Sequence, residues 1–278
     1  KPLSKSVAYC FHAAMLNRRT TLGLLVALPT APALGFGATA SAKLAGLLTR
    51  AAQADAALSP TGPPGRRRPA GEPVFIDPLS DEWATATLAN KRQAATELAG
   101  IDRAELTPAE RIAYDVFARS VQQAIQLHDS GLFAIQRRLA LNPSFGLHVE
   151  LPDFVAGPGA LFETEADYAA GLERLGLFAW HMDGAIVRLK QGLASGHVQS
   201  RVLVENVLKQ VEAMLALPAD QTPFMAAIGR MPPVLASSTS RWQVDYMGMV
   251  KGSVLPAYAR WRDFLTSTYL PATPVGPG

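Results

Sequence analysis

The order of apolar and polar positions along the chain indicates a protein built mainly from amphipathic helices. The longest regular pattern follows Thr164, where apolar residues recur at alternating spacings of four and three. Its members are Tyr168, Leu172, Leu175, Ala179, Met182, Ile186, Leu189 and Leu193. This spacing places all of them on one face of a helix. We therefore predict a long helix that Thr164 caps and Gly192 ends, with a stripe that packs into the core rather than against a cofactor.

Shorter patterns predict further helices over residues 43–58, 81–99, 107–128, 200–215 and 240–268, the last one bent near Pro256, with a short helix opening at Thr222. The clearest helix start is Thr107-Pro108-Ala109-Glu110. Thr107 can cap the helix, proline suits the first helical position, and Glu110 completes a capping box. The segment between residues 200 and 215 carries Val204 and Leu208 on one face.

Residues 142–152 have a different pattern, with breakers and with apolar side chains that alternate at Leu147, Val149 and Leu151. Alternation of this kind is typical of extended backbone. We predict an irregular loop or one short strand there. No internal repeat of the length found in helical arrays is visible. The expected fold class is thus all-α, an irregular helical domain with at most one short strand or hairpin.

The amino-terminal region has the pattern of an export signal. Arg18 and Arg19 precede an apolar run that Pro29 and Pro32 interrupt. A paired arginine before such a run is typical of twin-arginine signals. The run falls short of the about 20 continuous apolar residues that a membrane-spanning helix needs. The alternative is an uncleaved membrane anchor.

Small residues at Ala40 and Ala42 are those that a signal peptidase reads, which predicts cleavage before Lys43. Residues 1–42 would then be removed, and no stable membrane anchor would remain. The single cysteine, Cys10, lies in this segment, so the mature protein would have neither disulfides nor thiolate metal ligands. We expect a bacterial protein that is exported to the periplasm or to the extracellular space.

The charge balance excludes nucleic acid as the expected partner. The whole chain has a net charge of +3 and a pI near 9.1. Because four of the 26 basic residues lie in residues 1–42, 22 remain against all 23 acidic ones, and such a body does not attract phosphate. The triplet at residues 66–68 lies among prolines and glycines and predicts a solvated linker. We divide the mature chain into a helix plus linker (43–80) and a helical domain (81–278).

No catalytic or metal-binding residue can be assigned from motifs. A helical zinc site of the common type needs two histidines one turn apart with a glutamate between them, and no two histidines of this chain have that spacing. Serine hydrolase elbows are also absent. His148 and Glu150 could share one face of a short strand and contact a ligand; the alternative is a structural role in the loop. We expect His181 to be a packing histidine and His197 an exposed turn residue.

Three stretches, taken in order, resemble a known family. They are residues 101–115, the run Gly146-x-His148-x-Glu150-Leu151-Pro152 with residues 164–168 and 173–175 after it, and Leu255-Pro256-Ala257-Tyr258 with residues 264–271. Together they resemble the amino-terminal half of the bacterial family known as domain of unknown function 885.

The resemblance implies one half of a zincin-like cleft. Members of the family are similar to helical zinc metallopeptidases and carry a His-Glu-x-x-His-type helix in their later half, which this chain does not include. Zinc and a peptide-like substrate would therefore belong to a full-length form. This chain would supply one non-catalytic wall, without a cofactor of its own, and could self-associate through apolar surface that the other half covers. The alternative is an exported, non-enzymatic helical module that binds a partner or peptide.

Overall fold

A computed structural model of the chain describes residues 38–62, 65–67 and 71–274, so the predicted export residues Arg18 and Arg19 lie outside the described residues. Within these ranges every regular element is helical and there is no strand, which confirms the all-α fold class. No helix in the same part of the chain is long and apolar enough to cross a membrane.

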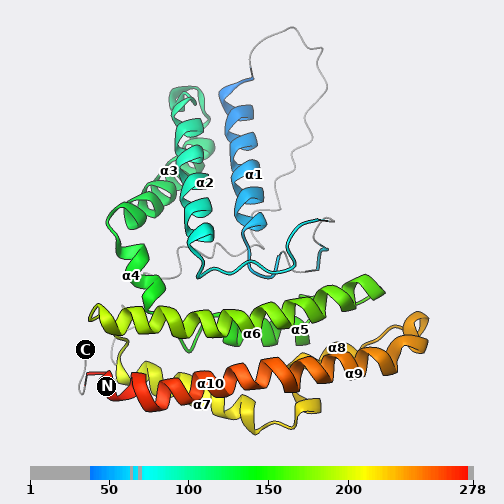
Figure 1. The fold of residues 1–278 in the computed structure, drawn as a ribbon. Coiled ribbons are helices and arrows are strands. Elements are labelled where there is room, and N and C mark those ends of the chain that lie inside the picture. The colour runs from blue at the N-terminus through cyan, green and yellow to red at the C-terminus, as the bar shows by residue number, and fades with distance from the viewer. Residues whose placement is uncertain (1–37, 63–64, 68–70, 275–278) are drawn as a thin grey trace, which may run out of the picture.

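Three helices form an upright bundle: α1 (Ala40–Ala57), α2 (Asp81–Ala99) and α3 (Pro108–Asp129) (Figure 1). They share a small core of their own, with Leu47, Leu98 and Val121 buried in it. Thr107 and Glu110 form the predicted capping box at the start of α3. Helix α1 belongs to the predicted unit 43–80 and α2 to the predicted domain 81–278, and because α1 packs on α2 the two helices share one core. The boundary between residues 80 and 81 stays a prediction.

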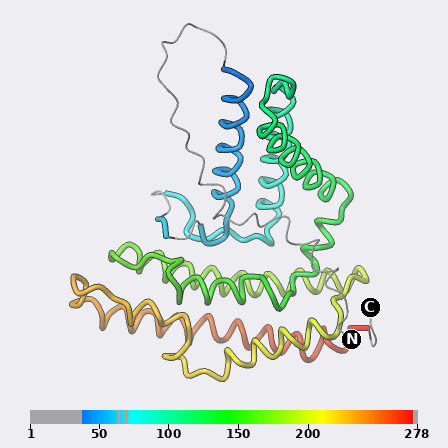
Figure 2. Tube along the Cα trace, turned by 180° about the vertical axis from the view of Figure 1, so that it is seen from behind, coloured from blue at the N-terminus to red at the C-terminus, as the bar shows by residue number. Residues whose placement is uncertain are grey.

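The remaining helices form a lower layer, which α4 (Leu132–Arg138) joins to the bundle (Figures 1 and 2). They are α5 (Leu147–Ala156), α6 (Glu165–Ala194), α7 (Arg201–Ala216), α8 (Ala226–Gly229), α9 (Thr239–Met249) and α10 (Leu255–Phe264). Short 3₁₀ turns lie at Arg103–Glu105, Ala219–Gln221, Pro223–Met225, Pro233–Ser238 and Leu270–Ala272. A π-helical turn at Val250–Val254 joins α9 to α10, and a second one at Leu265–Tyr269 extends α10. The irregularity predicted near Pro256 is thus a change of helix type just before it.

Helix α6 is the centre of the lower layer and confirms the longest sequence pattern. Thr164 and Asp167 form a capping box at its start. Leu175 and Leu189 are fully buried in the core cluster that also contains Tyr246 of α9 and Trp261 of α10. The helix ends at Ala194, not at Gly192. A Cβ atom at position 192 would lie 2.8 Å from the carbonyl oxygen of Arg138, so glycine is needed there for the close approach of α4.

Residues 142–146 form the predicted irregular loop, but helix α5 shows that the prediction of a loop or strand was wrong for residues 147–152. Its buried residues, Leu147, His148, Leu151, Pro152 and Val155, have the spacing of a helix face. A proline inside a helix has no N–H to bond the carbonyl four residues earlier, which is that of His148. The Tyr258 hydroxyl of α10 donates to this carbonyl instead, at 2.9 Å. A tertiary hydrogen bond thus replaces the missing helical one.

Candidate functional site

Helix α6 carries a row of polar residues at seven-residue intervals, which we call the polar row. Its members are Asp167, Arg174, His181 and Arg188, and each directly precedes a core residue of the same helix. Seven residues make almost two helical turns, so the four side chains leave α6 on one side. They bind the segment that precedes α2, described at residues 65–67 and 71–80, which we call the strap.

The first contact fixes the strap at the amino-terminal end of α6. The guanidinium of Arg67 donates from Nε and Nη2 to the two carboxylate oxygens of Asp167, at 2.6 and 2.7 Å. Burial opposes ionisation of Asp167, but the bonds from Arg67, from the Glu163 and Thr164 amides and from the Thr164 hydroxyl outweigh it and lower its pKa to about 2. Arg67 is exposed, as expected in a linker, but it is bound rather than free.

The two central contacts are less exposed. Arg174 donates from Nε to the carbonyl of Val74 at 3.1 Å. His181 lies 2.7 Å from Asp77 (Nδ1 to Oδ1), and both side chains are buried. Burial works to raise the pKa of Asp77, but hydrogen bonds from His181 and the Leu79 amide leave that pKa below its ordinary value. His181 is thus a buried histidine, as expected, with a carboxylate partner that the sequence did not reveal.

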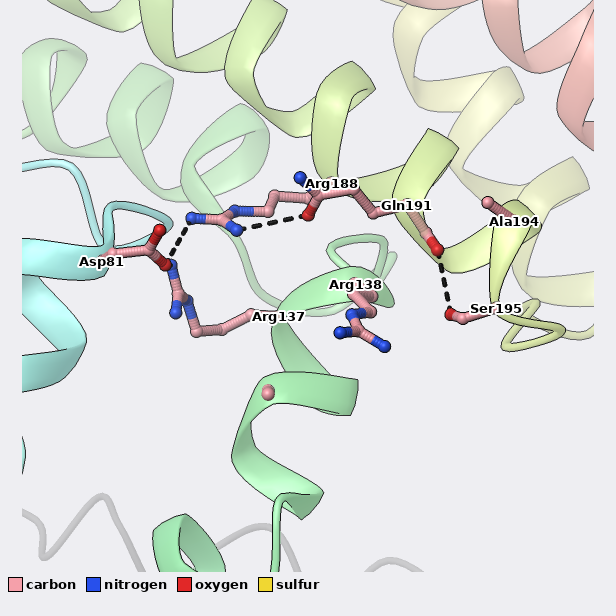
Figure 3. A pocket seen from close by; sticks show the side chains of 8 residues that line it. Asp81, Arg137, Arg138, Arg188, Gln191, Ala194 and Ser195 are labelled. Carbon is pink, nitrogen blue, oxygen red and sulfur yellow. Dashed lines mark hydrogen bonds and ion pairs between the residues drawn. The ribbon is translucent and has the colours of Figure 1, made fainter.

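At its last position the polar row meets α4. Arg188 of α6 and Arg137 of α4 both donate to the carboxylate of Asp81, at 2.9 and 2.8 Å (Figure 3). Both also donate to the carbonyl of Leu79. The hydrogen bonds from Arg137 and Arg188 lower the pKa of Asp81. Two guanidinium groups therefore share one carboxylate.

A groove of about 530 Å³ opens beside this cluster. We call it the arginine groove; its lining residues are Asp81, Ala134, Arg137, Arg138, Arg188, Gln191, Ala194 and Ser195. Three arginines face one carboxylate, which leaves an excess of two positive charges. Among the described residues, none forms a hydrogen bond or ion pair with the guanidinium of Arg138. Nε of Arg137 is also buried without a partner. The arrangement can accept an anion.

The structure does not bring together the residues singled out as weak candidates for ligand contact. Residues two apart on a helix project to nearly opposite sides, and in α5 the His148 side chain is buried whereas Glu150 is exposed. The His148 ring packs edge-on against Trp261 with 4.9 Å between the ring centroids, and burial lowers its pKa to about 4. Ala40 and Ala42, the predicted cleavage signal, lie in the first turn of α1.

Metal ligands are not gathered in the part of the chain that the structure describes: it contains no group of three or more histidine, cysteine, aspartate or glutamate side chains that could hold an ion. His197 lies in the turn after α6, where its Nδ1 is 3.0 Å from the Ser195 hydroxyl at the edge of the arginine groove. The histidine, aspartate and glutamate side chains of the described residues therefore do not fit a zinc site.

Sequence reasoning missed the arginine groove. On the α6 side, the sequence signal was the polar row itself, because its residues recur every seven positions and each directly precedes a core residue. The α4 side gave no comparable signal, because a helix of 7 residues is too short for a periodic pattern.

Comparisons with known proteins give a family and a fold. A family model described as "Bacterial protein of unknown function (DUF885)" matches residues 74–278. No curated protein matches the chain. A crystal structure from Colwellia psychrerythraea, described as that of a candidate lipoprotein, is similar with a TM-score of 0.63 at 16% identity, over 84% of this chain and 42% of the other. The chain thus spans less than half of that neighbour, and at this identity the likeness shows the fold alone.

Proposed function

Because the chain belongs to the bacterial family DUF885, whose model matches residues 74–278, we propose that it forms one wall of the substrate cleft of an exported, peptidase-like protein. Its own contribution is binding rather than chemistry: the arginine groove holds a carboxylate of a peptide-like substrate. The observation that carries this proposal is the cation of Arg138, which has no partner among the described residues and stands in a groove where two further arginines already share one carboxylate.

The chemistry of the groove favours a carboxylate. Guanidinium groups bind carboxylates through paired, charge-assisted hydrogen bonds. The side chains of Arg137 and Arg188 are only 11% and 19% exposed, and Asp81 and the Leu79 carbonyl hold both in place. A ligand that binds there does not have to order them, which reduces the entropic cost of binding.

The polar row supports the groove from a distance. Because Arg67, Asp77 and the carbonyls of Val74 and Leu79 are each bound by α6, the strap delivers Asp81 and the Leu79 carbonyl to a fixed place beside Arg188. The groove is therefore assembled from three segments that are distant in sequence. The first is the strap together with the start of α2, the second is α4, and the third is α6.

Export and the larger cleft are part of the same proposal. The pair Arg18 and Arg19 supports export, and the solved neighbour of which this chain covers 42% supports a longer form with a second wall. Peptide as the substrate class follows from the resemblance to metallopeptidases. An exported, non-enzymatic binding module would use the same groove, and a peptide hydrolysis assay of the longer form distinguishes the two.

The test is a thermodynamic cycle measured by titration calorimetry. N-acetylated apolar peptides, with either a free carboxylate or an amide at the carboxyl end, are titrated into the wild-type chain and into Arg138→Gln. We expect the acid to bind wild type about tenfold more tightly than the amide, and this preference to disappear in Arg138→Gln. Arg119→Gln, which removes an exposed arginine of α3, is the matched control and should behave as wild type. Equal affinities of wild type for acid and amide would refute the proposal.

A further inference from the structure

The outward face of α6 carries an exposed apolar strip that the fold does not use. Trp180 is 60% exposed and Val187 is 54% exposed, and the two residues lie seven positions apart on one side of the helix. The other tryptophans are engaged: Trp242 and Trp261 are buried, and the indole N–H of Trp83 donates to the carbonyl of Leu58. A side chain as large and apolar as that of tryptophan is rarely exposed on the central helix of a layer.

This strip continues into the arginine groove. Gln191 and Ala194 line the groove, and they follow Val187 by four and seven residues, so all three lie on the same face of α6. The strip is also narrow. The polar row and the strap border it on one side, and on the other side α10 is joined to α6 by the ion pair of Arg260 with Asp183, at 2.8 Å.

We infer that Trp180 and Val187 are the side-chain contacts of an extended peptide whose terminal carboxylate lies in the arginine groove. This inference rests on the proposed function, because it takes the carboxylate in the groove as its starting point. A single row of exposed side chains suits one extended chain. A packed helix would need an apolar stripe about 100° wide, which the strap and α10 do not leave free. The ligand is thus a peptide with a free carboxyl end and apolar or aromatic side chains before it.

Helix geometry sets the length of this peptide. With a rise of about 1.5 Å per residue, Val187 lies about 6 Å and Trp180 about 16 Å along α6 from Gln191. An extended peptide advances about 3.3 Å per residue. Alternate side chains of an extended peptide point to the same face. The side chain about two residues from the carboxyl end therefore reaches Val187, and the side chain about four residues from that end, on the same face, is the nearest one to the large indole of Trp180. Acids of about three residues should contact only Val187, whereas acids of about six residues should contact both.

The experiment compares N-acetylated apolar peptides of three and six residues, each with a free carboxylate, in calorimetry and tryptophan fluorescence. The six-residue acid should change the emission of wild type but not that of Trp180→Phe, and the three-residue acid should change neither. Trp180→Ala should lower the affinity for the six-residue acid about tenfold and leave the affinity for the three-residue acid unchanged. Val244→Ser, which alters a valine of α9 that is 70% exposed, is the control for surface substitution and should bind both acids as wild type does.

Two outcomes separate the failure of this inference from failure of the proposed function. If Arg138→Gln lowers the affinity for both acids but Trp180→Ala lowers neither affinity, the carboxylate site is supported. The inference that the strip contacts the peptide is then refuted. If Arg138→Gln weakens neither acid, the proposed function itself fails. A dimer in light scattering that Trp180→Ala dissociates, with no effect of peptide, would show that a second copy covers the strip and would also overturn the inference.

Discussion

Replacing Tyr258 by phenylalanine removes the one side-chain donor that the described part of the chain offers to the carbonyl of His148. This carbonyl has no helical partner, because Pro152 occupies the position whose amide would bind it. Both the Tyr258 and the His148 side chains are buried, so the carbonyl loses its hydrogen bond away from solvent. An unsatisfied buried acceptor costs about 1–3 kcal/mol. We expect Tyr258→Phe to lower the free energy of unfolding by that amount.

A second substitution makes this prediction specific to the hydrogen bond. Pro152→Ala restores a backbone N–H four residues after His148, which can donate to the same carbonyl. In this background Tyr258→Phe should cost less, by about 1 kcal/mol or more, and this difference is the coupling energy of the double-mutant cycle. Urea unfolding followed by circular dichroism measures all four free energies. If Tyr258→Phe costs the same in both backgrounds, the hydroxyl does not replace the missing helical bond.

The other predictions concern export, the core and pH. Changing Arg18 and Arg19 to lysine should leave precursor in the cytoplasm, and normal export in a fractionation assay would rule out the twin-arginine assignment. Leu175→Asp buries an unpaired carboxylate, at a cost of several kcal/mol that is comparable with the whole stability, so an unchanged melting temperature would show that the stripe is not core. His148 has a folded pKa of about 4, below its ordinary 6.5, so the unfolded chain binds more protons between these values and stability rises with pH across that window. Wild type should lose about 3 kcal/mol more than His148→Phe between pH 6.5 and 4, and parallel unfolding curves for the two would contradict this.

The helices with strong periodicity could be predicted from the sequence because their signals are local. Thr107 and Thr164 form the expected capping boxes. The 4-and-3 spacing of α6 gives its buried stripe, with Leu175 and Leu189 in the core. In these helices the same residues satisfy the local backbone and the packing against neighbours, so a pattern in one segment is sufficient.

Helix α5 could not be predicted in this way, because its stability depends on a residue 106 positions after its proline. Pro152 and the alternating apolar residues favoured a loop or strand, and only the fold brings the Tyr258 hydroxyl to the freed carbonyl. The hypothesis of a site at His148 and Glu150 rested on that strand, so it lost its geometric basis together with the strand.

The arginine groove lies between these two cases. Arg188 belongs to a seven-residue repeat that is visible in the sequence, but its partner Asp81 starts another helix and Arg137 comes from a short one. Charges on helix surfaces are usually solvated, so nothing local distinguishes these three residues from ordinary surface ones. Their meeting is a property of the packed chain.

A crystal structure of the chain with an N-acetylated apolar peptide that has a free carboxyl end tests the assignment of the arginine groove. We predict that the terminal carboxylate lies in the arginine groove between α4 and α6, at hydrogen-bond distance of about 2.7–2.9 Å from the guanidinium of Arg138. Electron density for the carboxylate at another site, with only solvent in the arginine groove, would contradict the role of this groove as the carboxylate site.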